Sequence, residues 1–321
     1  MKPRDILLAV AVTATWGVNF VVIEVGLGHY PPLLFNALRF SLAAVPAIFF
    51  VGRPQVPWRW ILAVAGTLAV TKFSLLFAGM AAGMPAGLSS LVLQSQAVFT
   101  LIFAVLFLRE RPRTQQIAGL AVAAAGIGLV ATRVGGTLPV GAFLLVIGAA
   151  VAWGLANIAT RQASPPDTLR FMVWVSAAGA LPLAVLSLLV EGPATGMAAL
   201  RATDLEALGS LLFVALISTL AGFGGWGFLI RRYGASTVAP FSMLVPVFGL
   251  ASAAVFLGEA IHPSDLAGAA LVIGGVLIGA ISVPGRRSGR RVSSAAANGV
   301  SAASGSAPVA RAALSSPRRS G

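Results

Sequence analysis

The chain has 321 residues, of which 58% are hydrophobic and 10% are charged, and its mean hydropathy is +0.93. Soluble domains carry roughly 25% charged residues, so this composition excludes an ordinary water-facing surface and predicts a bundle that faces lipid. The absence of cysteine excludes disulfides, thiolate metal sites and a cysteine nucleophile.

Ten apolar runs are long enough to cross a bilayer, which takes about 20 helical residues. The first run has no small-residue cleavage site, so we expect a retained helix and not a signal peptide. The sequence therefore predicts an all-α integral membrane protein with ten transmembrane helices. In chain order these are residues 5–27, 32–51, 60–81, 85–108, 114–132, 138–160, 168–190, 206–230, 235–257 and 263–283.

The formal net charge of +13 is distributed over short loops and one tail, which argues against a nucleic-acid partner. With ten crossings, only Arg133 and Arg201 fall in loops on one side. Because basic loops stay on the cytoplasmic side, we expect both termini in the cytoplasm and a bacterial inner-membrane location. The basic residues of that side before the tail are Lys2, Arg4, Arg53, Arg59, Arg109, Arg111, Arg113, Arg161, Arg170, Arg231 and Arg232.

The C-terminal stretch, residues 285–321, consists mainly of Ser, Ala, Gly and Arg with almost no large apolar side chains. This composition predicts a disordered, basic, cytoplasmic tail. Two interpretations stay open. The tail is either solvated and only reinforces the orientation, or it binds the anionic lipids of the inner leaflet.

Residues 85–131 align without a gap on residues 234–280, at a constant offset of 149 residues. Identical positions include the glutamates Glu110 and Glu259. Five helices per half is an odd number, so the second half enters the membrane inverted. We predict a first five-helix repeat over 1–136 and a second, inverted repeat over 137–284, which is typical of transporters working by alternating access.

Six local motifs stand out along the chain: Trp16–Ile23, Pro31–Leu33, Leu38–Phe40, Gly83–Leu88, Leu91–Ala97 and Ala239–Val247. Together they resemble the EamA family of the drug/metabolite transporter superfamily. The resemblance covers about residues 5 to 283 and is closest to the branch of amino-acid metabolite exporters for O-acetylserine and cysteine. It implies a ten-helix carrier with a cavity built by helices 1, 3, 4, 6, 8 and 9, and it implies export.

Charges inside the predicted helices are the first candidates for function. Lys72 lies about 9 residues from the nearer helix end, roughly 13 Å deep at 1.5 Å per residue. A charge there costs about 2.5–3.5 kcal/mol on insertion scales, so Lys72 should face a cavity or form a structural ion pair. Glu24 and Arg39 are expected to form an ion pair between helices 1 and 2; alternatively, Glu24 is a proton-coupling carboxylate.

Amides and tryptophans supply the rest of the expected site. Gln94 and Gln96 lie near mid-membrane on different faces of one helix. Trp–Asn pairs occur in both halves, and an aromatic wall beside an amide suits an ammonium group; packing alone is the alternative interpretation. The expected substrate site therefore combines Trp16, Asn19, Lys72, Gln94, Gln96, Trp153 and Asn157.

Prolines and small residues predict helix shape. Pro240 and Pro246 should break the ninth helix and free carbonyls toward the cavity, while Pro46 and Pro182 should bend their helices. In the fifth and tenth helices, spacings such as Gly119/Ala123 and Gly275/Gly279 predict close helix packing.

We therefore predict a proton-coupled exporter of small amino-acid-like metabolites, with lipid as its surroundings. A multidrug or cation exporter is the alternative, although a deep Lys72 favours substrates that bear a carboxylate. A membrane enzyme is less well supported, because His29 and His262 fall in loops without metal-ligand spacing. No filter motif indicates a channel, and we expect neither a metal nor a cofactor.

Overall fold

The computed structural model describes residues 1–280, which are folded almost entirely into helices. Within this part of the chain, nine helices are long and apolar enough to cross a membrane, and a further, shorter apolar helix covers Pro263–Gly279. The prediction of an all-α, multi-pass membrane protein is confirmed at this level. The expected basic tail and residues 281–283 of the last predicted run lie outside the described residues.

The first half contains five long helical runs, and two of them change helix type along their length. The third run changes from α to π and back, and the fourth contains one 3-10 turn. The elements are α1 (Pro3–Leu27), α2 (Pro32–Val51), α3 (Trp58–Val64), η1 (Ala65–Lys72, π), α4 (Phe73–Ala81), α5 (Ala86–Val92), η2 (Leu93–Ser95, 3-10), α6 (Gln96–Leu108) and α7 (Thr114–Ala131).

The second half has the same order of long runs, with one addition. A short helix, α10, follows α9 in a stretch where the sequence reading placed only a loop. The elements are α8 (Val140–Ala163), α9 (Thr168–Val190), α10 (Pro193–Arg201), α11 (Leu205–Leu212), η3 (Phe213–Ala221, π), α12 (Gly222–Tyr233), α13 (Ala235–Val238), η4 (Ala239–Met243, 3-10), α14 (Leu244–Leu257) and α15 (Pro263–Ala280).

Helix-type changes occur at corresponding places in the two halves. The third run contains the π-helical segment Ala65–Lys72, and its counterpart in the second half contains Phe213–Ala221. The expected break near Pro240 is a 3-10 turn, Ala239–Met243. Because π-helical insertions widen the helix and are frequent at functional sites, these segments direct attention to the residues at their ends.

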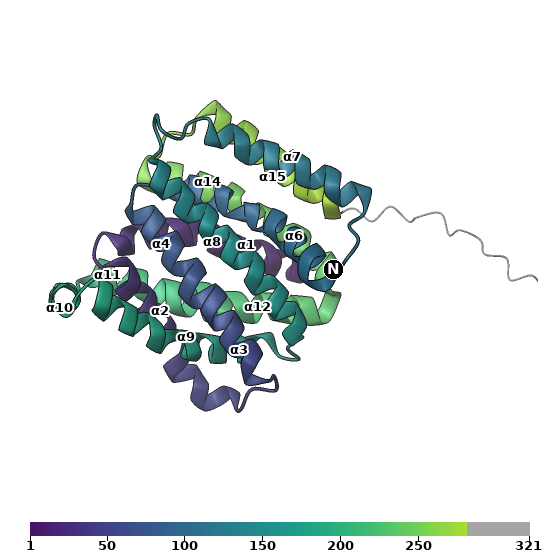
Figure 1. Ribbon diagram of the computed structural model, residues 1–321. Coiled ribbons are helices and arrows are strands. Elements are labelled where there is room, and N and C mark those ends of the chain that lie inside the picture. Colours follow the sequence, from purple (N-terminus) through teal and green to yellow (C-terminus); the bar gives the residue numbers. More distant parts are fainter. Residues whose placement is uncertain (281–321) are drawn as a thin grey trace, which may run out of the picture. The chain divides into compact units, whose positions relative to one another are not determined.

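The long helices run side by side, and they pack in pairs that join the two halves (Figure 1). The helices α2 and α9 pack on each other, α1 packs on α14, and α6 packs on α8. At one edge of the bundle α7 lies against α15 (Figure 1). A Cβ atom built on Gly119 would lie 2.6 Å from the backbone nitrogen of Gly279, so the predicted close packing of these helices is confirmed.

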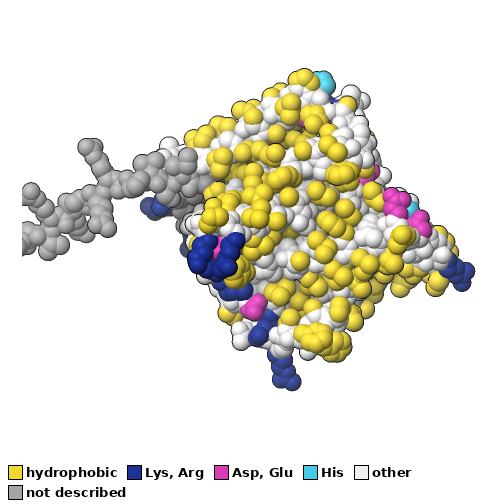
Figure 2. Space-filling model, turned by 180° about the vertical axis from the view of Figure 1, so that it is seen from behind, with side chains coloured by type: hydrophobic (Ala, Val, Ile, Leu, Met, Phe, Trp, Pro, Cys, Tyr) yellow, Lys and Arg dark blue, Asp and Glu magenta, His cyan; other side chains and the backbone are white. Residues whose placement is uncertain are grey.

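Charged side chains lie at opposite ends of the helices. We name as the basic face the end with Lys2, Arg53, Arg109 and Arg161, and as the acidic face the end with Glu191, Asp204, Glu206 and Glu259. Figure 2 shows hydrophobic side chains over the middle of one side, most visible Lys and Arg side chains toward one end, and Asp and Glu side chains at both ends. The apolar middle is what a bilayer-spanning bundle requires.

The glycine contact between α7 and α15 provides a test of the fold. Gly119→Ala places a methyl group against backbone of α15, and we expect it to destabilise the protein by about 1–3 kcal/mol. Gly128→Ala on the same helix is the matched control, because a Cβ atom there meets no atom within 4 Å. It should be neutral or stabilise by up to about 1 kcal/mol through helix propensity.

The measurement is the midpoint of thermal unfolding in detergent micelles. Equal midpoints for Gly119→Ala and Gly128→Ala would contradict the close approach of α7 and α15.

Candidate functional site

Two buried cations lie over one aromatic ring in the interior of the bundle. Arg39 of α2 is 2% exposed and Lys72, at the end of the π-helical segment, is 4% exposed. The Phe73 ring centroid lies 3.9 Å from Arg39 Cζ and 3.3 Å from Lys72 Nζ. The lysine ammonium also lies 4.7 Å from the Trp153 ring centroid. Such cation–π contacts are worth about 2 kcal/mol when desolvated, so they offset part of the cost of burial.

Hydrogen bonds fix the guanidinium of Arg39 across the two halves. Its Nε and Nη2 atoms both donate to Thr219 Oγ1, each at 3.1 Å. Thr219 belongs to the second π-helical segment and donates its own proton to the carbonyl of Val214 at 2.8 Å. The Arg39 Nη1 atom is buried and has no hydrogen-bond partner in the part of the chain that the structure describes.

This cluster has two basic side chains and no carboxylate in contact with it. Within residues 1–280, no carboxylate lies within the 4.0 Å ion-pair distance of either Arg39 or Lys72. Leaving a charge unpaired in a low-dielectric interior is strongly unfavourable. The cluster therefore supplies what a buried site for an anion needs: two charges, and the unused donor of Arg39 Nη1.

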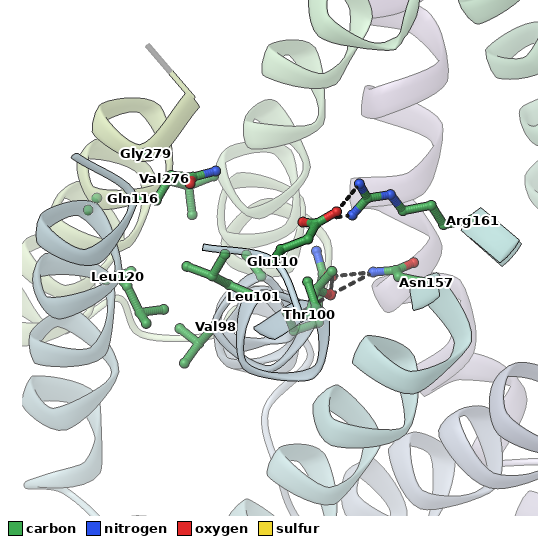
Figure 3. Close-up of a pocket in the computed structure, with 16 residues that line it drawn as sticks. Val98, Thr100, Leu101, Glu110, Gln116, Leu120, Asn157, Arg161, Val276 and Gly279 are labelled. Carbon is green, nitrogen blue, oxygen red and sulfur yellow. Dashed lines mark hydrogen bonds and ion pairs between the residues drawn. The ribbon is translucent and has the colours of Figure 1, made fainter. Parts of the chain in front are cut away.

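A second polar group lies one helical turn along α8 from Trp153. The Nδ2 atom of Asn157 donates to Gln96 Oε1 at 2.7 Å and approaches Thr100 Oγ1 at 3.0 Å. Thr100 donates to the carbonyl of Gln96 at 2.7 Å. Figure 3 shows Asn157 and Thr100 facing each other across this contact. The tight contact of Gly154 with Phe99, where a Cβ would lie 2.9 Å from the Phe99 Cβ, holds the two helices together.

A pocket of about 380 Å³ lies beside this amide group and extends to the basic face. At its mouth Arg161 forms a bidentate ion pair with Glu110 (Figure 3). The Nη1 atom donates to Oε2 at 3.2 Å and Nη2 donates to Oε1. The lining residues are Gln96, Ala97, Val98, Thr100, Leu101, Ala104, Glu110, Gln116, Gly119, Leu120, Ala123, Asn157, Arg161, Gly275, Val276 and Gly279.

The position of this pocket differs from the cavity that the resemblance implies. It is lined by α6, α7, α8 and α15, and so includes the fifth and tenth predicted helices. The reason lies in the close glycine packing of α7 on α15: these helices contact each other far more than they contact α6. The space beside α6 therefore remains open.

The structure divides the seven residues of the predicted substrate site into smaller groups. It places Lys72 against Trp153, and Gln96 against Asn157, as described above. Trp16 Nε1 donates to the carbonyl of Ser218 at 3.0 Å, and Gln94 Nε2 donates to that of Ser242 at 3.4 Å. Asn19 is buried, and its Oδ1 atom has no partner among the described residues.

The expected ion pair of Glu24 with Arg39 is not formed in this structure. Arg39 instead contacts Thr219 and Phe73. The Oε2 atom of Glu24 is buried without a hydrogen-bond partner in the described part of the chain. The physical reason is that Arg39 points into the bundle, where an aromatic face and a hydroxyl replace the carboxylate.

Sequence reasoning missed four residues of these clusters: Phe73, Thr100, Thr219 and Arg161. An aromatic or a threonine inside an apolar run gives no signal of its own. Arg161 did have a signal in the sequence. Trp153 follows its counterpart Trp16 by 137 residues, and the same offset makes Arg161 the counterpart of the candidate residue Glu24.

Comparisons with known proteins match almost the whole folded part. The sequence model of the EamA-like transporter family matches residues 4–132 and again residues 140–281. A relative from Salmonella typhimurium, described as a probable amino-acid metabolite efflux pump, is 43% identical over 90% of this chain and 99% of its own length. A protein of the same description from Escherichia coli K12 is 39% identical over 89% of this chain and 98% of its own length.

Two further matches are more distant. A probable terminal-alkyne amino-acid exporter from Streptantibioticus cattleyicolor is 30% identical over 87% of this chain and 94% of its own length. A solved crystal structure at 20% identity shares the fold with a TM-score of 0.60, over 87% of this chain and 99% of that one.

The bond from Arg39 to Thr219 can be tested by stability. Thr219→Val removes the acceptor of both Nε and Nη2 in a buried site, and we expect a loss of about 1–3 kcal/mol. Thr219→Ser keeps the oxygen and should stay close to the parent protein. Thermal unfolding in detergent distinguishes the two, and the assignment is wrong if the valine variant is as stable as the serine variant.

Proposed function

The chain belongs to the EamA-like transporter family, and we propose that it exports small amino-acid-like metabolites, of the O-acetylserine and cysteine type, across a bacterial inner membrane. Transport is the activity of this family, and the chain is a transporter and not an enzyme. Three relatives whose printed descriptions name amino-acid or amino-acid-metabolite export support the substrate class.

The observation that carries the proposal is the pair of unpaired cations at Arg39 and Lys72. A substrate carboxylate would supply the missing negative charge, and the free Nη1 atom of Arg39 would donate to one of its oxygens. Phe73 keeps the two cations oriented while no substrate is present. A cationic drug, the substrate of the alternative multidrug class, would meet repulsion at the same place.

The amino group of such a substrate needs acceptors and aromatic faces. The side-chain oxygens of Gln96 and Asn157 and the ring of Trp153 provide them on the neighbouring stretch of α8 and α6. Trp153 contacts Lys72 and lies one turn from Asn157, so it joins the carboxylate region to the amide region. We assign Trp16, Asn19 and Gln94 to the surrounding wall of the same path.

The proposed architecture is ten helices in two inverted repeats, 1–136 and 137–284, that work by alternating access. Matched contacts support it. A Cβ on Gly17 would lie 2.8 Å from Gly249 N, and one on Gly154 would lie 3.0 Å from Thr100 N. The two glycines are related by the offset of 137 and their partners by that of 149. The double match of the family model agrees.

The proposed orientation places the basic face, and with it both termini, in the cytoplasm. Positively charged loops are retained on that side of a bacterial inner membrane. The pocket at Glu110 and Arg161 then opens to the cytoplasm, where an exported metabolite enters. We keep the basic tail, 285–321, as a cytoplasmic segment in this scheme.

Lys72 gives the sharpest test of the substrate class. Lys72→Met keeps the length of the side chain and removes its charge. A hydrogen bond to a charged group contributes about 1.5–3 kcal/mol, so counterflow of amino-acid substrates in proteoliposomes should fall at least about tenfold. Lys2→Met, at the exposed N-terminal end on the basic face, is the matched control and should retain transport.

The same counterflow assay identifies the substrate. Competitors are a panel of amino acids, O-acetylserine and cationic dyes. Competition by O-acetylserine and by other small amino acids supports the proposal, whereas competition by the dyes alone overturns the substrate class.

We propose the proton as the driving ion and Glu24 as its carrier, because this carboxylate is the one acidic side chain with a buried, unpartnered oxygen in the described part of the chain. Glu24→Gln should leave folding intact and remove the dependence of transport on the pH gradient. Glu206→Gln, on the same face but exposed, should keep that dependence. Unchanged pH dependence of Glu24→Gln in proteoliposomes would dismiss the coupling role.

A further inference from the structure

On the acidic face, a carboxylate from the second half binds the end of a helix from the first half. Glu259 follows α14, and its Oε1 accepts from the backbone N–H of Ala86 at 2.6 Å while Oε2 accepts from that of Gly87 at 3.0 Å. These N–H groups begin the continuous helical run Ala86–Leu108. A helix N-terminus has free N–H groups and a partial positive charge, so this contact closes α14 onto α5.

Gly87 lies close to the groups that make this contact. A Cβ atom there would lie 3.0 Å from Glu259 Oε2 and 3.2 Å from the Cβ of Ala253. Leu250 and Ala253 are buried beneath the contact, with exposed fractions of 8% and 0%. On this face the two halves therefore pack directly against each other through α5 and α14.

The repeat assigns a counterpart to every part of this contact. The offset of 149 residues relates Glu259 to Glu110, and Ala86 and Gly87 to Ala235 and Ser236 at the start of α13. In this structure, however, Glu110 binds Arg161 of α8. Beside that ion pair lies the open pocket of the basic face.

The residue that meets each glutamate explains why the two ends differ. The offset of 137 residues relates Arg161 to Glu24. On the basic face Arg161 attracts Glu110 and holds it on α8. At the corresponding place on the acidic face Glu24 has the opposite charge, so it repels Glu259 and favours its position on the helix N-terminus.

From these contacts we infer that Glu259 and Glu110 are reciprocal gates of the transport cycle, which close the two faces in turn. In the state seen here Glu259 closes the acidic face and Arg161 holds the basic face open. In the opposite state Glu110 leaves Arg161 for the N–H groups of Ala235 and Ser236, and Glu259 releases Ala86 and Gly87. The inference rests on the alternating access of the proposed function.

The natural absence of cysteine makes the gates directly measurable. Leu101→Cys reports on the basic face, because Leu101 lines the open pocket. Leu250→Cys, its counterpart at the offset of 149, reports on the closed acidic face. Each is labelled in oriented membrane vesicles with a membrane-impermeant maleimide, and the gate substitutions are made in both backgrounds.

Glu259→Gln removes the charge of a hydrogen-bonded cap, and we expect labelling of Leu250→Cys to rise about tenfold. Glu191→Gln is the matched control. Glu191 caps α2 in the same way, accepting from the N–H groups of Leu33 and Leu34 at 2.6 and 2.9 Å, but it joins α9 to α2 away from the gate. It should leave the labelling unchanged.

The second gate, Glu110, is tested by changing Arg161, which binds it. Arg161→Gln frees Glu110, so labelling of Leu101→Cys should fall and that of Leu250→Cys should rise. Adding Glu110→Gln should reverse both changes, which a general loosening of the fold would not do. The inference is overturned if Glu259→Gln has no larger effect than Glu191→Gln, or if Glu110→Gln does not reverse the effect of Arg161→Gln.

Labelling needs no substrate, so its outcome is separate from that of the proposed function. Failure of the gates would leave amino-acid counterflow as a valid test, and failure of counterflow with amino acids would leave the labelling result standing. If Glu259→Gln elutes as an aggregate in size-exclusion chromatography, the Arg161 and Glu110 variants test the reciprocal exchange by themselves.

Discussion

A polar group in the interior of this bundle has no water to bind, so it must find a partner within the protein or a ligand. Most polar groups here have one: Asn36 donates to the carbonyl of Ala69 in the first π-helical segment, and Ser176 donates to that of Met172. Arg39 and Lys72 are different, because aromatic rings and a hydroxyl surround two positive charges that no carboxylate neutralises. The remaining imbalance is the basis on which we propose that this place in the bundle binds an anionic group.

The same requirement governs the ends of the helices. Glu191 and Glu259 each satisfy two N–H groups at the start of a helix in the other half of the chain, and Arg133 pairs with the buried Asp265 between α7 and α15. These contacts join the halves through a few side chains at the faces, while small residues join them in the middle. A contact made by one carboxylate can be exchanged without disturbing the packed interior, which suits the proposed alternating access.

The helix positions, the charge separation and the duplication follow from the sequence because they depend on composition over about 20 residues or on long matched stretches. The π-helical segments do not, since Ala65–Lys72 and Phe213–Ala221 have ordinary apolar compositions. The partner of Arg39 also could not be predicted from the sequence. A carboxylate at Glu24 was the obvious choice by charge, but the direction of a side chain from its helix decides which groups it reaches, and that direction points Arg39 at Phe73 and Thr219. Lys72 could be placed at depth, yet its contact with Trp153 depends on the packing of η1 on α8.

The repeat in the sequence matches many positions of the two halves, but it does not require equal charges at matched positions. Arg161 and Glu24 occupy related places and have opposite charges, and the glutamates they meet are in different states. With identical residues at both places, neither gate would be preferred, and the two conformations would have similar free energies. A charge difference of one side chain per half is enough to bias such an equilibrium by a few kcal/mol, because hydrogen bonds to charged groups contribute about 1.5–3 kcal/mol each. In the proposed cycle, the resting conformation of the bundle is therefore set at its two faces, by the charge that meets each gate glutamate.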